Sequence, residues 1–229
     1  MRLKQSKRLE RTHAIVPVNI PTKSKFRLSS LLSPKERAQL TIAMLRDVLA
    51  ALKRVRRLSR ITIVCADRDV TKTAKKFHVD FVWEGPRRGL NKGLRLAIRK
   101  TQQNGAAAVL VVHADIPLIK PREVDRLLKI GQNYHVAIVP SKDGIGTNAL
   151  LLKPPSVIRP AFGRGSFQRH LQLAERDKLR YRVLKLPSIS FDVDEPTDLR
   201  TLRRHLTPSE TYQFLTTTAL SHTGSQREP

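Results

Sequence analysis

The stretch Ala107-Ala-Val-Leu-Val-Val-His113 is the most strongly apolar part of the sequence. A continuous apolar run of this length, rich in valine, is typical of a strand buried on both faces, as the strands of parallel sheets are. Just before it, Asn104-Gly105 closes a helical pattern in the way expected of residues that adopt the left-handed conformation. The run therefore predicts the central strand of a mostly parallel sheet covered by helices.

Strand and helix patterns alternate along the chain on both sides of this run. Further strands are predicted at residues 14–18, 61–66, 81–84, 135–139, 148–152 and 181–186. Helices are predicted at residues 34–55, 70–77, 91–103, 121–130, 166–176 and 196–205. The first helix has the clearest start, with Ser33 and Glu36 forming a capping box around Pro34, and Ser166 is the expected N-cap of the fifth. This alternation predicts an α/β fold with a doubly wound, Rossmann-like sheet in a single domain.

The chain length and composition set the expected domain organisation. With 229 residues, 40% of them hydrophobic, the chain can bury one substantial core. We expect one domain over residues 13–206, a basic N-terminal arm over residues 1–12, and a polar, disordered tail over residues 207–229. No window is apolar enough to span a bilayer, and no secretory signal is recognisable. The lone Cys65 allows no internal disulfide, which fits a reducing compartment, so we expect the cytoplasm.

The formal net charge of +25 has three possible explanations. Clustered lysine and arginine can bind nucleic acid, a cationic field can attract small polyanionic substrates, or the charge can simply be a solvated surface. The basic residues are spread along the whole chain and aromatic residues make up only 5% of it, which leaves little for base stacking. We therefore disfavour a nucleic-acid partner.

Carboxylates follow two of the hydrophobic runs. Asp115 stands at the end of the central strand, where it can hold a hard cation such as Mg²⁺ or merely cap the next turn. Asp192 and Asp194 are two residues apart, so in extended backbone both point to the same face, where their charges repel unless a cation is present. The alternative is that Asp194 caps the helix starting at Pro196 and Asp192 pairs with a surface arginine. The scarcity of acidic residues, 19 against 44 basic ones, favours the metal site.

Several stretches are suited to binding anions. Ligands of such sheets bind beyond the carboxyl ends of the strands, and helix N-termini and glycine-rich turns present backbone amides to anions. The candidates are Lys23, Lys25 and Arg27 after the first strand, Gly89-Leu-Asn91, Gly163-Arg-Gly-Ser166, and the hydroxyl of Thr147. The histidines show no metal-ligand spacing, and the serine-hydrolase elbow and the P-loop motif are both absent from the sequence.

Taken in order, these motifs resemble a known family. They are Ile15-Val-Pro-Val18, Lys25-Phe-Arg-Leu28, Leu32-Ser-Pro-Lys-Glu-Arg37, Gly89-Leu-Asn91, Ala114-Asp-Ile-Pro-Leu118, Gly146-Thr-Asn-Ala-Leu150, Phe162-Gly-Arg-Gly-Ser166 and Asp192-Val-Asp-Glu-Pro196. The succession resembles the 2-phospho-L-lactate and phosphoenolpyruvate guanylyltransferases of coenzyme F-420 biosynthesis, over roughly residues 14–206. Their fold is that of the nucleotide-diphospho-sugar transferases.

The resemblance implies a reaction and a set of site residues. GMP would move from GTP to the phosphate of phosphoenolpyruvate or 2-phospho-L-lactate, with release of pyrophosphate. The implied metal ligands, for two Mg²⁺, are Asp115, Asp192 and Asp194, and the implied acceptor-binding residues are Thr147, Gly163 and Ser166. The nucleotide side would be formed by Lys23, Lys25, Arg27, Gly89 and Asn91. A homodimer is common in such folds.

The sequence also departs from the family pattern. Asn19 stands where lysine is usual, which leaves open whether Lys23, Lys25 or Arg27 neutralises the triphosphate, and Pro86-Arg-Arg88 is more basic than usual. Two other functions stay open. One is a related nucleotidyltransferase that uses 3-phosphoglycerate, a sugar phosphate or molybdopterin, and the other is a non-enzymatic nucleic-acid-binding module.

Overall fold

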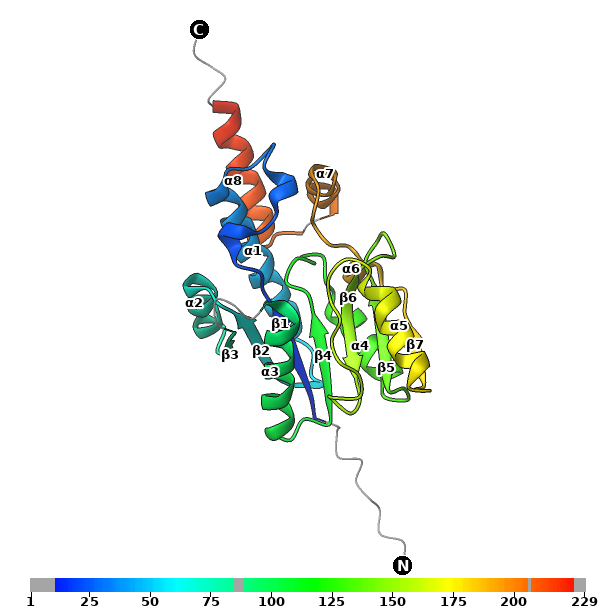
Figure 1. Cartoon of the computed structure of the whole chain (residues 1–229). Coiled ribbons are helices and arrows are strands. Elements are labelled where there is room, and N and C mark those ends of the chain that lie inside the picture. Colours follow the sequence, from blue (N-terminus) through cyan, green and yellow to red (C-terminus); the bar gives the residue numbers. More distant parts are fainter. Residues whose placement is uncertain (1–10, 85–88, 206, 225–229) are drawn as a thin grey trace, which may run out of the picture.

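A computed structural model of the chain describes residues 11–84, 89–205 and 207–224, which form an α/β domain around a seven-stranded sheet (Figure 1). The strand order is β3-β2-β1-β4-β6-β5-β7. The strands are β1 (Thr12–Pro17), β2 (Leu58–Cys65), β3 (Asp80–Trp83), β4 (Ala108–Val112), β5 (Val136–Pro140), β6 (Thr147–Leu152) and β7 (Tyr181–Val183). Only β6 runs antiparallel to its neighbours, β4 and β5, so the expected mostly parallel α/β sheet is confirmed.

Helices cover both faces of the sheet. In Figure 1, α3 (Leu90–Gln103) and α5 (Ser166–Arg176) lie on the near face. The far face is covered by α1 (Pro34–Lys53), α2 (Arg68–Lys76) and α4 (Pro121–Gly131). Each face has its own apolar cluster, one built around Leu49, Leu110 and Leu127, the other around Leu94, Val111 and Leu150. Because both faces are buried, β4 has no exposed residue, as its apolar sequence predicts.

The N-termini of α1 and α5 can be compared with the N-cap residues predicted from the sequence. The capping box of α1 is present, with Glu36 N–H donating to the Ser33 hydroxyl and the Glu36 carboxylate accepting from Ser33 N–H. In α5 the cap is Gly165, in a left-handed conformation with φ of 74°, and Ser166 is the first helical residue. The prediction of Ser166 as N-cap is therefore wrong by one residue.

The prediction of a disordered tail is wrong for helix α8 (Glu210–Gly224). The Asp47 carboxylate of α1 accepts hydrogen bonds from the first backbone amides of α8, at Glu210 (3.0 Å) and Thr211 (2.9 Å). Leu215 enters a third apolar cluster with residues of α1 and α7 (Pro196–His205). Contacts with distant residues hold α8, which is why local periodicity does not reveal it. Residues 1–10 of the basic arm, Pro86-Arg-Arg88 and residues 225–229 lie outside the described residues.

The sheet topology fixes where a site can form. Strand β1 lies between β2 and β4. The chain passes from β1 to β2 and β3 on one side of the sheet, and the later strands β4, β6, β5 and β7 lie on the other side. The carboxyl ends of β1 and β4 therefore flank a switch in strand order, the place where open α/β sheets bind ligands. The segment after β1 contains Lys25, and Asp115 follows β4. None of the described helices is long and apolar enough to cross a membrane.

Candidate active site

Asp115, Asp192 and Asp194 meet at the carboxyl end of β4. Val193 N–H donates to the Asp115 carbonyl (3.0 Å), so this segment runs alongside the residues that follow β4. The Val193 side chain is fully buried in the third apolar cluster. Asp192 and Asp194, one residue to either side, face the acidic site, and their charges act on each other and on Asp115. We call these three residues the acidic rim.

Lys25 lies between two members of the acidic rim. Its ammonium donates to Asp115 Oδ2 (2.6 Å) and Asp194 Oδ1 (2.8 Å), and its side chain is only 7% exposed. Burial lowers the pKa of Lys25, but the two carboxylates outweigh burial and hold the pKa above its ordinary value. The Lys25 backbone is left-handed, with φ of 56°, which is unusual for a lysine and places the residue before the short turn Phe26–Leu28. Lys25 thus neutralises carboxylates, whereas the sequence predicted a triphosphate contact.

Part of the acidic rim is not neutralised by Lys25. Asp115 Oδ1 and Asp192 Oδ1 are buried and have no hydrogen-bond partner within the described part of the chain. Burial, together with the charges of Asp115 and Asp194, raises the pKa of Asp192 to about 6. Buried carboxylate oxygens without partners are suited to a hard cation. Within residues 11–84, 89–205 and 207–224, no three histidine, cysteine, aspartate or glutamate side chains are arranged to hold a metal ion, and the Lys25 ammonium stands between two of the carboxylates.

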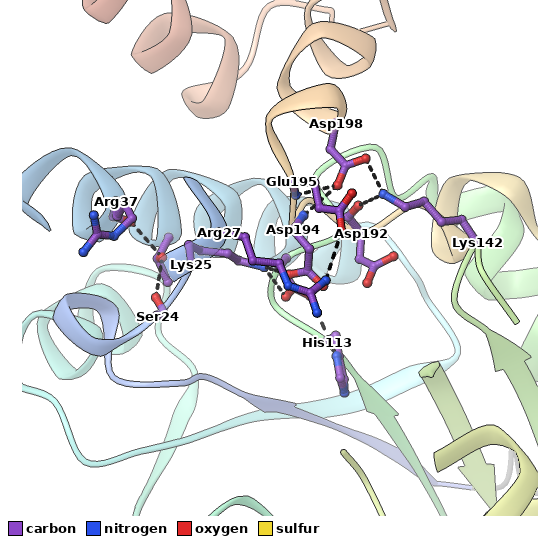
Figure 2. Close-up of polar contacts among 12 residues, drawn as sticks. Ser24, Lys25, Arg27, Arg37, His113, Lys142, Asp192, Asp194, Glu195 and Asp198 are labelled. Carbon is purple, nitrogen blue, oxygen red and sulfur yellow. Dashed lines mark hydrogen bonds and ion pairs between the residues drawn. The ribbon is translucent and has the colours of Figure 1, made fainter. Parts of the chain in front are cut away.

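A second lysine holds the Asp192–Glu195 segment from the opposite side, as Figure 2 shows. Lys142, in the loop between β5 and β6, forms an ion pair with Asp198 and donates to the Asp192 carbonyl (3.2 Å). The other Asp198 oxygen accepts from the backbone amides of Asp194 (2.9 Å) and Glu195 (2.8 Å). The Asp198 carboxylate therefore holds the two residues that precede α7, and Asp194 instead pairs with Lys25. The sequence did not single out Lys142 or Asp198.

The other predicted nucleotide-binding residues differ in their surroundings. Arg27 forms an exposed ion pair with Glu195 (3.1 Å), which places it beside the acidic rim (Figure 2). Lys23 is exposed in the short turn Pro21–Lys23. Gly89 caps α3 with φ of 70°, a conformation that favours glycine. Asn91 is the second residue of α3, and its side-chain amide is hydrogen bonded to the backbone of Phe162, as described below.

The three predicted acceptor-binding residues lie around the N-terminus of α5. Thr147 and Ser166 are each 1% exposed, and Gly163 has φ of 113°. The Thr147 hydroxyl is 3.0 Å from His170 Nδ1. We call residues 161–166 the acceptor loop.

His170 is a buried residue of the acceptor side that the sequence did not single out. Its Nε2 accepts from Ala161 N–H (3.0 Å), so a neutral ring carries its proton on Nδ1 and donates it to the Thr147 hydroxyl. Burial and the nearby Arg169 charge lower the pKa of His170 to about 4, which keeps the ring neutral.

Strand β6 links the two halves of the site. Successive strand residues point to opposite faces. Thr147 contacts His170 of α5, whereas the Asn148 amide donates to the carbonyls of Ile189 (3.1 Å) and Ser190 (3.0 Å), just before Asp192. Adjacent residues of one motif thus support the acceptor loop and the acidic rim.

Of two cavities in the domain, one is lined by predicted site residues and the other is not. A small cavity of about 40 Å³, lined by Lys25, His113 and Asp115 among others, lies at the ends of β1 and β4. A cleft of about 970 Å³ lies between α1, α2 and α8, and none of the predicted site residues lines it. The cavity with the relevant chemistry is therefore the small one.

A mostly parallel α/β sheet with a carboxylate cluster at its topological switch defines the class: this is the fold of the nucleotidyltransferases. A nucleotide-diphospho-sugar transferase structure from Desulfovibrio desulfuricans superposes with a TM-score of 0.71 at 23% identity, covering 91% of this chain and 95% of the other. A nucleotidyl transferase from Methanothermobacter superposes with a TM-score of 0.65 at 16% identity, covering 85% and 97%.

Within this class, the chain belongs to the family described as guanylyl transferase CofC like, whose model matches residues 12–227. It is 41% identical to the phosphoenolpyruvate guanylyltransferase of Rubrobacter xylanophilus, covering 82% of this chain and 92% of the relative. It is 38% identical to the enzyme of the same name from Sphaerobacter thermophilus, covering 85% and 93%. It is 33% identical to the 2-phospho-L-lactate guanylyltransferase of Methanocaldococcus jannaschii, covering 88% and 86%.

Proposed function

We propose that the chain is a guanylyltransferase that moves GMP from GTP to the phosphate of phosphoenolpyruvate or 2-phospho-L-lactate and releases pyrophosphate. The observation that carries this proposal is the convergence of Asp115, Asp192 and Asp194 at the sheet switch point in a chain of this family. The higher identities to phosphoenolpyruvate enzymes, 38% and 41% against 33%, favour phosphoenolpyruvate as the acceptor. The product would serve coenzyme F-420 biosynthesis in the cytoplasm, and a homodimer is the expected assembly.

The reaction needs positioning more than proton transfer. An oxygen of the acceptor phosphate attacks the α-phosphorus of GTP, a new P–O bond forms, and the bond between the α-phosphorus and the bridging oxygen breaks. Pyrophosphate leaves with that oxygen, so charge and atoms balance without a general base. Holding the two anions in line and neutralising their charge supply most of the rate in such transfers.

We infer that the acidic rim would hold a magnesium ion once the Lys25 ammonium leaves Asp115 and Asp194. The unpartnered oxygens of Asp115 and Asp192 would hold it, with Asp194 beside them. The metal would neutralise the charge that develops on the triphosphate as pyrophosphate leaves. Lys25 and Arg27 would supply further positive charge, once the Lys25 ammonium exchanges its carboxylate partners for phosphate oxygens.

A panel of acceptors tests this function. The purified chain is incubated with each of the four nucleoside triphosphates and with phosphoenolpyruvate, 2-phospho-L-lactate, 3-phosphoglycerate or a sugar 1-phosphate, with and without Mg²⁺. Pyrophosphate release is then measured. We expect release with GTP and phosphoenolpyruvate or 2-phospho-L-lactate, and only with the metal. A clear preference for a sugar phosphate or another nucleotide would refute the proposed substrates.

A further inference from the structure

Asn91 and Phe162 are joined by two hydrogen bonds across 71 positions of the sequence. Phe162 N–H donates to Asn91 Oδ1 (2.8 Å), and Asn91 Nδ2 donates to the Phe162 carbonyl (3.0 Å). The pair satisfies both backbone groups of Phe162 with one amide side chain, which fixes the orientation of that amide. The Asn91 side chain is therefore directed at the acceptor loop.

His170 holds the same loop from the other side. Its Nε2 accepts from Ala161 N–H (3.0 Å), and its Nδ1 lies 3.0 Å from the Thr147 hydroxyl of β6. Since His170 is fully buried, both bonds form away from competing water. The residues on either side of the Ala161–Phe162 peptide are thus anchored to different elements, α5 and α3.

The Phe162 ring connects this anchored peptide with the acidic rim. Its centroid lies 4.9 Å from that of His170, in an edge-on arrangement, and 5.2 Å from that of His113. His113 directly follows β4 and is two residues before Asp115. The three rings therefore pack between the acceptor loop and the end of β4.

The anchors matter because the rest of the loop is rich in glycine. Gly163 and Gly165 have φ of 113° and 74°, conformations that glycine adopts readily. Arg169 adds two contacts, to the carbonyls of Ala161 (3.1 Å) and Arg164 (2.6 Å), but its side chain is exposed. Without buried anchors at its start, the loop would sample many arrangements, and a displacement of about 1 Å costs much in binding and rate.

We propose that Asn91 and His170 are positioning residues for the acceptor, and that Asn91 does not read the guanine base. This inference rests on the proposed function, because it takes the acceptor loop as the binding site of the phosphorylated acid. It moves Asn91 from the nucleotide side, where the sequence placed it, to the acceptor side. Both residues act through the backbone at Ala161 and Phe162 and touch no reacting atom.

Steady-state kinetics of the full chain, with GTP and the acceptor varied separately, tests the inference. Asn91→Ala and His170→Leu should each raise the KM for the acceptor about tenfold, the size expected for losing buried hydrogen bonds. The KM for GTP and the preference for GTP over ATP should stay within about twofold of the wild type, because neither side chain is directed at the nucleotide. His205→Gln, an exposed position at the end of α7, is the matched control and should change neither KM.

Conservative variants separate positioning from folding. An asparagine at position 170 can place its amide nitrogen near the Nδ1 position and keep the Thr147 bond, whereas a glutamine can place its oxygen near Nε2 and keep the Ala161 bond. We expect the acceptor KM of His170→Asn and of His170→Gln to lie between those of the wild type and His170→Leu. These variants also keep a result available if His170→Leu does not fold.

The kinetic results can refute the positioning role of Asn91 and His170 separately from the proposed guanylyltransferase activity. An active wild type in which Asn91→Ala raises the KM for GTP, or relaxes guanine preference, would overturn the inference and leave the function standing. An equal rise in the KM for GTP and the KM for the acceptor in all variants would also overturn it, because that is what a distortion of the whole active site produces. A wild type that transfers GMP to none of the acceptors would refute the proposed function itself.

Discussion

The acidic rim and the acceptor loop lie on either side of His113 and differ in whether their buried polar groups have hydrogen-bond partners. In the acidic rim, one buried oxygen each of Asp115 and Asp192 has no hydrogen-bond partner among the described residues, and burial together with the charges of Asp115 and Asp194 raises the pKa of Asp192 to about 6. In the acceptor loop, the backbone at Phe162 and both ring nitrogens of His170 are hydrogen bonded. Under the proposed function, the acidic rim would be completed from outside by a cation or nucleotide, whereas the hydrogen bonds of the acceptor loop are already formed.

Removing one carboxylate of the acidic rim should have the largest effect. Asp115→Asn and Asp192→Asn should each lower kcat by about a thousandfold or more, the scale of losing transition-state electrostatics. The reason is that an amide keeps the shape of the side chain but cannot neutralise a cation. Pyrophosphate release at saturating GTP and acceptor measures the effect.

Asp177→Asn, at the exposed end of α5, is the control and should leave kcat unchanged. If the acidic-rim variants retained near-normal kcat while the acceptor-loop variants lost it, the contrast between the two regions would be reversed.

Lys25→Met should cause the next largest effect, which is a loss of unfolding free energy. The substitution leaves Asp115 and Asp194 without their shared counter-ion. Breaking a fully buried ion pair typically costs about 3 to 5 kcal/mol of unfolding free energy, and we expect the lower end of this range because the Asp194 side chain is 47% exposed. Urea unfolding without metal measures the loss. Because the ammonium and a divalent cation would use the same carboxylates, Mg²⁺ should stabilise the variant more than the wild type.

Lys23→Met is the matched control, since Lys23 is exposed in the neighbouring turn, and it should change stability little. Equal stabilisation of Lys25→Met and the wild type by Mg²⁺ would show that Lys25 and the metal do not share these carboxylates.

His170 allows a test of the acceptor loop by pH. The folded pKa of about 4 lies below the ordinary value of 6.5, so the unfolded chain binds the proton more readily. The stability that neutral His170 provides is therefore present above about pH 6.5 and is lost as the pH falls toward 4, amounting to up to about 3 kcal/mol.

The measurement is urea unfolding of the wild type and His170→Gln between pH 7 and pH 4. Burial also lowers the pKa of His13 and His113, so the difference between the two proteins isolates His170. We expect the wild type to lose more stability than the variant over this range. Parallel losses would mean that His170 is already protonated, or not buried, in the folded chain.

The sequence could predict what local patterns and strand ends determine. The β4 run, the capping box of α1 and the placing of Asp115 after a buried strand each depend on a few consecutive residues. Asp192 and Asp194 could be paired because residues two apart share a face. These features carry their signal within a short stretch of chain.

Contacts between distant residues could not be predicted in the same way. His170 meets Thr147 across 23 positions and Lys142 meets Asp198 across 56, and neither pair has a recognisable spacing. Helix α8 is anchored by Asp47, 163 positions before Glu210. Lys25 was identified as a site residue, but its carboxylate partners depend on how β1 and β4 are arranged in the sheet.

Arg27→Ala should have the smallest effect on stability and so sharpens the contrast with Lys25, two residues before it. The Arg27 and Glu195 side chains are 71% and 55% exposed, and exposed ion pairs contribute less than about 1 kcal/mol. Because Arg27 lies at the edge of the acidic rim, its loss should instead raise the KM for GTP severalfold and leave the acceptor KM unchanged. Urea unfolding and steady-state kinetics of the same preparation measure both. A large loss of stability with no change in the KM for GTP would mean that Arg27 serves the fold, as Lys142 does, and not the nucleotide.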